Sequence, residues 1–190
     1  MSAKFRRFVP RLEALDDRSL PSVTVTQFGT ILLIQGDNAA DTVAIMDNGQ
    51  ASGVSVQYNE NNVDKTYFAT APVTSIVVDT LGGTDTVDYW LTGTLLQDRS
   101  VSANLGGRAD TFAAHLSNQT ITFGTTLFIS AHGDGGGDRL TLDAYNLSTE
   151  LDSQVNVDFS GGRGKDTITM NYTQGDISLG MVNLFSDNPQ

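Results

Sequence analysis

The sequence contains no cysteine and no long apolar run, and each absence excludes a class of protein. Without cysteine the chain has no disulfides and no thiolate metal sites, so its stability must come from other interactions. No run of eighteen apolar residues occurs, which predicts that the chain has no membrane span. With 190 residues, 39% of them hydrophobic, the chain is long enough for one domain with a lean core.

Glutamate, histidine and basic residues are also scarce. Only three of the 22 acidic residues are glutamate, and the formal net charge is −11. Five of the 11 basic residues lie within the first twenty positions, so the rest of the chain is strongly acidic. Such a body repels nucleic acid and anionic membranes and attracts cations, which predicts that nucleic acid is not a partner. Aspartate favours turns and is a short-armed oxygen ligand for metals.

A glycine-containing turn that ends in aspartate and leads into a β-forming run occurs five times. The aspartates are spaced by 44, 25, 28 and 28 residues, and threonine follows four of them. The five segments are GDNAADTVAI (36–45), LGGTDTVDYW (81–90), LGGRADTFAA (105–114), GDGGGDRLTL (133–142) and GGRGKDTITM (161–170).

A repeat of 25 to 28 residues made of alternating apolar and polar positions is typical of a β-solenoid. Each unit offers two clear strands, one on each side of the turn, and enough remaining chain for a third. The sequence therefore predicts an all-β fold, a parallel β-helix or solenoid with coils of about 25–28 residues. Two packed antiparallel sheets, a β-sandwich, use the same strands and remain the alternative.

Three segments depart from the repeat. Residues 1–22 precede it as a leader or an N-terminal cap, and 23–190 form a single solenoid domain. The long first interval includes residues 46–75, which are either an inserted hairpin around Asn59 to Asp64 or a coil without a Gly-Asp turn. The strand-like segment 181–185 aligns with 155–159, and the chain then stops, so the last repeat is incomplete.

Stacking of the coils at about 4.8 Å would align the five aspartates in a column. Two carboxylates about 5 Å apart repel by roughly 0.8 kcal/mol in water and roughly 3 kcal/mol at an effective dielectric of 20. Glycines in the turns expose carbonyl oxygens beside these carboxylates, and such an all-oxygen site suits calcium. The alternative is a metal-free turn, in which the aspartate accepts a hydrogen bond from backbone amides.

The turn GGRGKD resembles the GGxGxDxUx nonapeptide of the RTX, or haemolysin-type, calcium-binding repeats. The turn GDGGGD is similar, with Asp134 in place of the second glycine. The other three turns are shortened or keep fewer glycines, and the turns are not back to back as in that family. The resemblance implies bound Ca²⁺ held by Gly161, Gly162, Gly164, Asp166, Gly133, Gly136, Asp138 and Asp134, with Asp41, Asp85 and Asp110 as weaker candidates.

The start of the chain, KFRRFVPRLEALDDRSLPS, resembles a leader of large exported proteins of planctomycete-type bacteria. That leader has basic residues followed by an LExLEDRxLPS core, and here Asp16 replaces its usual glutamate. The resemblance implies export to the cell surface or the extracellular space, together with repetitive domains. No apolar stretch of an ordinary signal peptide follows the basic residues, and an amphipathic cap on the first coil is the alternative.

No catalytic constellation stands out. The only two histidines, His115 and His132, fall in different repeats, and the glycine-rich turns lack the GK[ST] ending of a phosphate-binding loop. These features favour a non-enzymatic structural or adhesive domain, stabilised by calcium and in contact with envelope polysaccharide or other surface repeat proteins. A polysaccharide-binding or polysaccharide-cleaving β-helix, in which Trp90 and Tyr89 stack on a sugar, is the alternative, and a metal-free spacer is a third.

Overall fold

The described part of the chain is built from β-strands, whose side chains alternate between the core and the surface. The computed structural model describes residues 22–61 and 63–187, and this part contains strands and turns but no helix. It therefore contains no helix that could cross a membrane. The leader predicted for residues 1–22 lies almost entirely outside the described residues.

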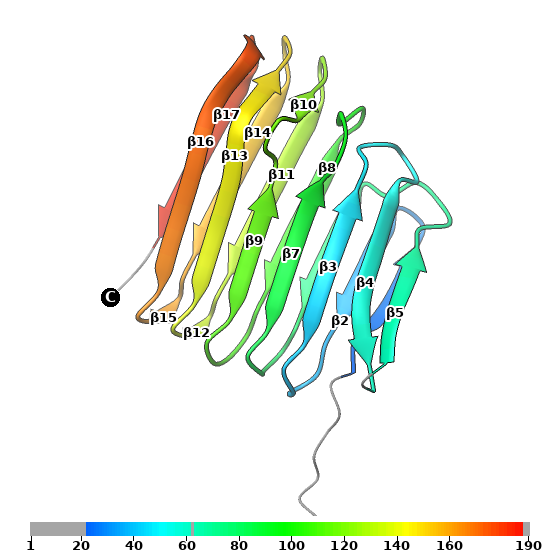
Figure 1. The fold of residues 1–190 in the computed structure, drawn as a ribbon, viewed down its shortest axis with the longest axis vertical. Helices are drawn as coiled ribbons and strands as arrows, with labels where there is room; N and C mark the ends of the chain where they lie inside the picture. The colour runs from blue at the N-terminus through cyan, green and yellow to red at the C-terminus, as the bar shows by residue number, and fades with distance from the viewer. Residues whose placement is uncertain (1–21, 62, 188–190) are drawn as a thin grey trace, which may run out of the picture.

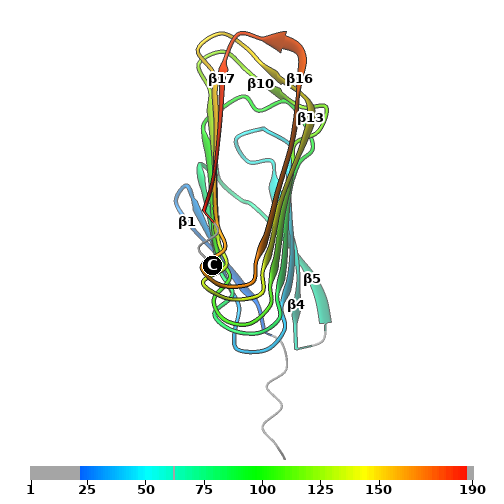
Figure 2. The same cartoon turned by 90° about the vertical axis from the view of Figure 1, so that its left-hand side faces the viewer.

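The strands form two sheets that face each other across the core (Figures 1 and 2). The seven-stranded sheet has, in spatial order, β1 (Thr24–Phe28), β2 (Ile31–Gln35), β6 (Ser75–Asp79), β8 (Arg99–Asn104), β11 (Thr126–His132), β14 (Gln154–Ser160) and β17 (Met181–Asp187). The eight-stranded sheet runs β10 (Thr120–Ile121), β13 (Arg139–Thr149), β9 (Thr111–His115), β7 (Thr86–Leu91), β3 (Thr42–Asp47), β4 (Val54–Glu60) and β5 (Val63–Phe68), and β16 (Thr167–Ser178) pairs with β13.

Each coil consists of one strand from each sheet, joined by a Gly-Asp turn. Successive coils pair in parallel, because Thr86 lies opposite Thr111, which lies opposite Arg139, which lies opposite Thr167. The all-β solenoid prediction is therefore confirmed, and the β-sandwich alternative is wrong because the coil-to-coil pairing is parallel. The short strands β12 (Gly135–Gly136) and β15 (Arg163–Gly164) also pair in parallel, inside two neighbouring turns.

The remaining chain of each coil does not build a full third face. It supplies β10 and the far end of β13, where Ser148 and Thr149 pair with β10. In β13 the register shifts between Ala144 and Leu147, so the second and third strands of that coil run on as one bulged strand. The repeat spacing predicted room for a third strand in each coil. In this coil the bulge joins the third strand to the second.

The long first interval is a hairpin. Strand β4 pairs antiparallel with β3, and β5 pairs antiparallel with β4, with Asn59 opposite Asp64. Strand β1 is likewise antiparallel to β2. Both sheets therefore end in antiparallel strands on the N-terminal side, whereas the C-terminal side ends in parallel strands.

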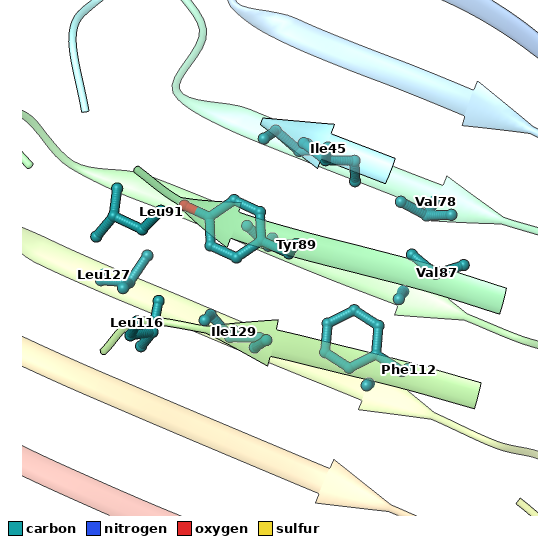
Figure 3. Close-up of a cluster of buried hydrophobic side chains, with 14 of the residues drawn as sticks. Ile45, Val78, Val87, Tyr89, Leu91, Phe112, Leu116, Leu127 and Ile129 are labelled. Carbon is teal, nitrogen blue, oxygen red and sulfur yellow. The ribbon is translucent and has the colours of Figure 1, made fainter. Parts of the chain in front are cut away.

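The core is the space between the two sheets. Inward side chains from successive coils meet there, as Figure 3 shows for Val87 and Phe112 on one sheet and Val78 and Ile129 on the other. All four are fully buried. The rings of Phe112 and Phe159 lie edge to face at 5.6 Å, which ties the middle of the stack to a later coil.

An ion pair lies inside this core. The Arg99 guanidinium donates from Nε to Asp47 Oδ2 at 2.6 Å and from Nη2 to the Gln50 carbonyl at 3.1 Å, and both charged side chains are fully buried. The Tyr89 hydroxyl donates to the same carboxylate at 3.0 Å. Removal of one partner of such a pair leaves an uncompensated charge, which costs about 3–5 kcal/mol. The cluster joins the end of β3, where Asp47 lies, to the start of β8, where Arg99 lies, beside the inserted hairpin.

Candidate functional site

The five repeated aspartates form an internal ladder. The backbone N–H of each of the first four aspartates donates to Oδ1 of the aspartate in the next coil, at 2.8 or 2.9 Å. The links run from Asp41 to Asp85, Asp110, Asp138 and Asp166 in that order. The predicted column exists, but its carboxylates point inward and are nearly buried, with exposed fractions of 1% to 9%. The column is therefore part of the core boundary and does not form an outer edge.

Glycine at the start of a turn makes room for the carboxylate that ends it. A Cβ atom added to Gly133 would lie 2.3 Å from Oδ2 of Asp138, and one added to Gly36 would lie 2.1 Å from Oδ2 of Asp41. Neither glycine has a positive φ, so the requirement is space rather than backbone conformation. Glycine and aspartate therefore form a packing pair in these turns, whereas Thr80 and Leu105 stand at the equivalent positions before Asp85 and Asp110.

The carbonyl groups of the turns are used in coil-to-coil hydrogen bonds. Arg163 N–H donates to the Asp134 carbonyl at 2.7 Å, and Arg108 N–H donates to the Gly135 carbonyl at 2.6 Å. Gly135 N–H in turn donates to the Gly106 carbonyl at 3.0 Å. These carbonyl oxygens, which the sequence offered as metal ligands, hold neighbouring turns together.

The column concentrates charge in a poorly solvated place. Burial raises the pKa of Asp110 to about 7, against the hydrogen bond from Asp85 N–H, and the carboxylates of Asp85 and Asp138 raise it further. Burial likewise raises the pKa of Asp41 to about 6 and lifts those of Asp85 and Asp138. In each of these four carboxylates one buried oxygen has no hydrogen-bond partner. The folded chain thus favours protonated aspartates.

The structure brings the predicted calcium residues together in two stacked turns. Gly136 lies opposite Gly164, and a Cβ on either Gly162 or Gly164 would collide with the backbone of the turn before it. Gly161 packs on Asp166 as Gly133 packs on Asp138, whereas Asp134 is exposed at a positive φ of 61°. Among residues 22–61 and 63–187, no three histidine, aspartate or glutamate side chains are grouped so that they could hold one metal ion.

A second polar row runs along the outer face of the eight-stranded sheet. The rings of Trp90 and His115 stack with centroids 3.7 Å apart, and His115 lies 3.6 Å from Asp88 and 3.7 Å from Asp143. Asn171 donates to Asp143 Oδ1 at 2.9 Å. A hollow of about 540 Å³ adjoins this row and is lined by Trp90, Leu91, Thr92, His115, Ser117, Gln119, Asp143 and Tyr145.

The predicted pairing of Trp90 with Tyr89 on a sugar is not possible, because Tyr89 is fully buried and only Trp90 is on the surface. Sequence reasoning also missed the buried Asp47 and Arg99. Strand alternation carried the signal, because Asp47 shares the inward parity of Val43 and Ile45 in β3. Charged residues at inward positions of a strand indicate a buried pair.

Comparisons with known proteins identify no relative. No family model matches the chain, no curated protein matches it, and no solved structure matches it. The site is therefore interpreted from its own geometry.

The packing pair predicts unequal effects of two alanine substitutions in one turn. We expect Gly133→Ala to lower the free energy of unfolding by about 1–3 kcal/mol, because its methyl group overlaps the Asp138 carboxylate. Gly135→Ala is the matched control, since a Cβ there meets nothing within 4 Å and its φ is negative. Urea unfolding of the two variants measures the difference. Equal losses would contradict the packing explanation.

The raised pKa values predict that stability falls as pH rises. Because burial moves the pKa of Asp110 to about 7 from 3.8, the folded chain binds more protons than the unfolded chain between about pH 4 and 7. The stability that this group contributes is therefore greatest below about pH 4 and is lost as pH rises from about 4 to about 7, by at most about 1.4 kcal/mol per pH unit for each titrating group.

Thermal melts from pH 5 to 8 measure this slope. Asp110→Asn mimics the protonated carboxyl and keeps the oxygen that accepts from Asp85, so it should flatten the profile. Asp158→Asn, at an exposed position of β14, is the control and should leave the slope unchanged. A profile that is equally steep in all three proteins would refute the assignment to the ladder.

Proposed function

We propose that this chain is a non-enzymatic structural repeat domain, a stiff spacer or adhesive module of the cell surface. The observation that carries the proposal is the aspartate ladder, which links all five turns by the same hydrogen bond. A residue that repeats in every coil serves the stack as a whole, whereas a catalytic residue is needed at one place. The surface location rests on the resemblance of the leader, which lies outside the described residues.

Local geometry supports a ladder that is held by backbone amides. In the two turns that best match the calcium repeat, Asp138 and Asp166 each accept a backbone N–H through Oδ1. The glycine that opens each of these turns packs against the same side chain. Protonation is favoured in this arrangement, since the pKa of Asp138 is raised by burial and by the neighbouring carboxylates Asp166 and Asp134.

Calcium stabilisation stays a prediction that this column can test. The acidic chain attracts cations, and a buried carboxylate column gains stability from either protons or metal. A calcium site with a Kd of about 10⁻⁴ M, at about 1 mM calcium, would add roughly 1.4 kcal/mol to folding. Calcium binding requires charged carboxylates, whereas the hydrogen-bonded ladder also forms when the carboxylates are protonated.

Two substitutions at Asp138 separate these cases. We expect Asp138→Ala to lower Tm by about 4–8 °C, equally in calcium and in chelator, because Asp110 N–H loses its acceptor. Asp138→Asn keeps an acceptor oxygen and should lose much less. Calorimetric melts with millimolar calcium and with EGTA make the measurement. If the wild-type Tm rose with calcium and the Tm of neither variant did, the ladder would be metal-bound rather than held by amides.

Glycan binding is a second candidate function, favoured by the hollow beside Trp90. Two exposed aromatic side chains, Trp90 and Tyr145, line it together with the polar Ser117, Gln119 and Asp143. Tyr145 is directed outward because it shares the parity of Thr141 and Asp143, and the alternation of β13 breaks only after it, at Asn146. Aromatic rings with one apolar surface and polar neighbours suit a sugar.

A glycan array probed with the wild-type chain and with Trp90→Ala tests this candidate. Specific binding that is abolished in the variant would support it. Phe128→Ala provides the control, since Phe128 is equally exposed, at 39%, on the other sheet. Binding that both variants lose, or no binding by the wild type, would leave the structural role as the only function supported.

A further inference from the structure

The two ends of the solenoid differ in how their sheets terminate. At the N-terminal end, antiparallel strands are added to both sheets, β1 on β2 and the β4–β5 hairpin on β3. At the C-terminal end the last strands are β16 and β17, seen at the left edge of Figure 1. Among the described residues β16 pairs only with β13, and β17 only with β14. Within the described part of the chain, the outer edges of β16 and β17 thus carry no paired strand.

This C-terminal end also leaves the core partly open. The inward residues of the last strands, which complete the core rows, are half-buried, whereas their equivalents one coil earlier are fully buried. They are Ile168, Met170, Tyr172, Val182 and Leu184. Another coil-shaped surface placed on this end would bury them as each coil buries the one before it.

Charge is nearly absent from this end, although the chain as a whole is acidic. Strand β16 carries one charged residue, Asp176, and β17 carries one, Asp187. Natural edge strands usually avoid pairing by means of lysine, proline or a covering element, and neither strand contains lysine or proline. The N-terminal edge strand β5, by contrast, carries Asp64 and Lys65. A second copy of this acidic chain would meet little repulsion at the C-terminal end.

We propose that two copies of the chain associate through their C-terminal ends as a twofold-symmetric dimer. In this dimer β16 pairs antiparallel with β16 of the second copy, and β17 with β17, which keeps inward residues inward on both sides. The interface extends the coil-to-coil contact that already builds the solenoid. A twofold contact is closed, so it yields a dimer and no filament.

The size of the end fits such an interface. Strand β16 has 12 residues, so it spans about 40 Å at roughly 3.3 Å per residue. Two sheets about 10 Å apart, with their outer side chains, make the end about 20 Å thick. The end thus offers about 800 Å² per partner, which is the area typical of a stable and specific interface.

Two matched double variants test the proposal by light scattering after size exclusion. Thr169→Lys with Phe185→Lys adds charge to the outer faces of β16 and β17 and should give a monomer, because lysine on an edge strand opposes pairing with another chain. Thr66→Lys with Phe68→Lys makes the same changes on β5, at the opposite end, and should leave the dimer intact. Circular dichroism of both variants checks that they remain folded.

The wild-type chain should elute with twice the 20.3 kDa mass of one chain. A wild type that is monomeric at every concentration would overturn the proposal. So would a series of masses above the dimer, since it would mean head-to-tail growth. Dissociation by the β5 variant, with the β16 and β17 variant still dimeric, would place the interface at the wrong end. None of these outcomes bears on the ladder, whose test is the melting of single-site variants.

Discussion

The hydrogen bond from one aspartate amide to the next aspartate carboxylate is the constraint on which the arrangement of the turns depends. It requires coils in parallel register about 4.8 Å apart, because only then does Oδ1 reach the amide of the coil before it. It also requires the side chain to turn inward, and in three of the five turns a glycine five residues earlier leaves the space for it. In the turns that begin at Gly36, Gly133 and Gly161, the glycine and the aspartate solve one packing problem together.

The same bond explains how charge is tolerated in a lean core. Adjacent carboxylates at coil spacing repel one another by roughly 3 kcal/mol at an effective dielectric of 20. The backbone amides offset part of this, and the raised pKa values of Asp41 and Asp110 mean that proton binding in mild acid offsets more of it. The ion pair of Arg99 and Asp47 handles the other buried charge differently, with direct compensation. A spacer role suits a stack in which every joint is nearly the same.

Much of this could be predicted from the sequence. The spacing of Asp85, Asp110, Asp138 and Asp166 predicts coils, and alternation in segments such as 155–159 predicts their strands. The inward direction of the aspartates could not be predicted, because Gly-Asp turns occur with the carboxylate on either side of the backbone. The merging of two strands in β13 was also hidden, since it depends on a bulge at Ala144 that no local pattern announces. Tyr89 and Trp90 are adjacent in sequence, and only the register decides which of the two is buried.

The ladder has a direction, because its donor and its acceptor always belong to successive coils. Insertion of one more 28-residue unit between two turns would replace one link by two, and excision of a unit would replace two links by one. The hydrogen bond between two coils therefore does not depend on the number of coils in the stack. Gene duplication or unequal recombination that changes the length of this protein in steps of one coil therefore keeps the same hydrogen bond at every turn.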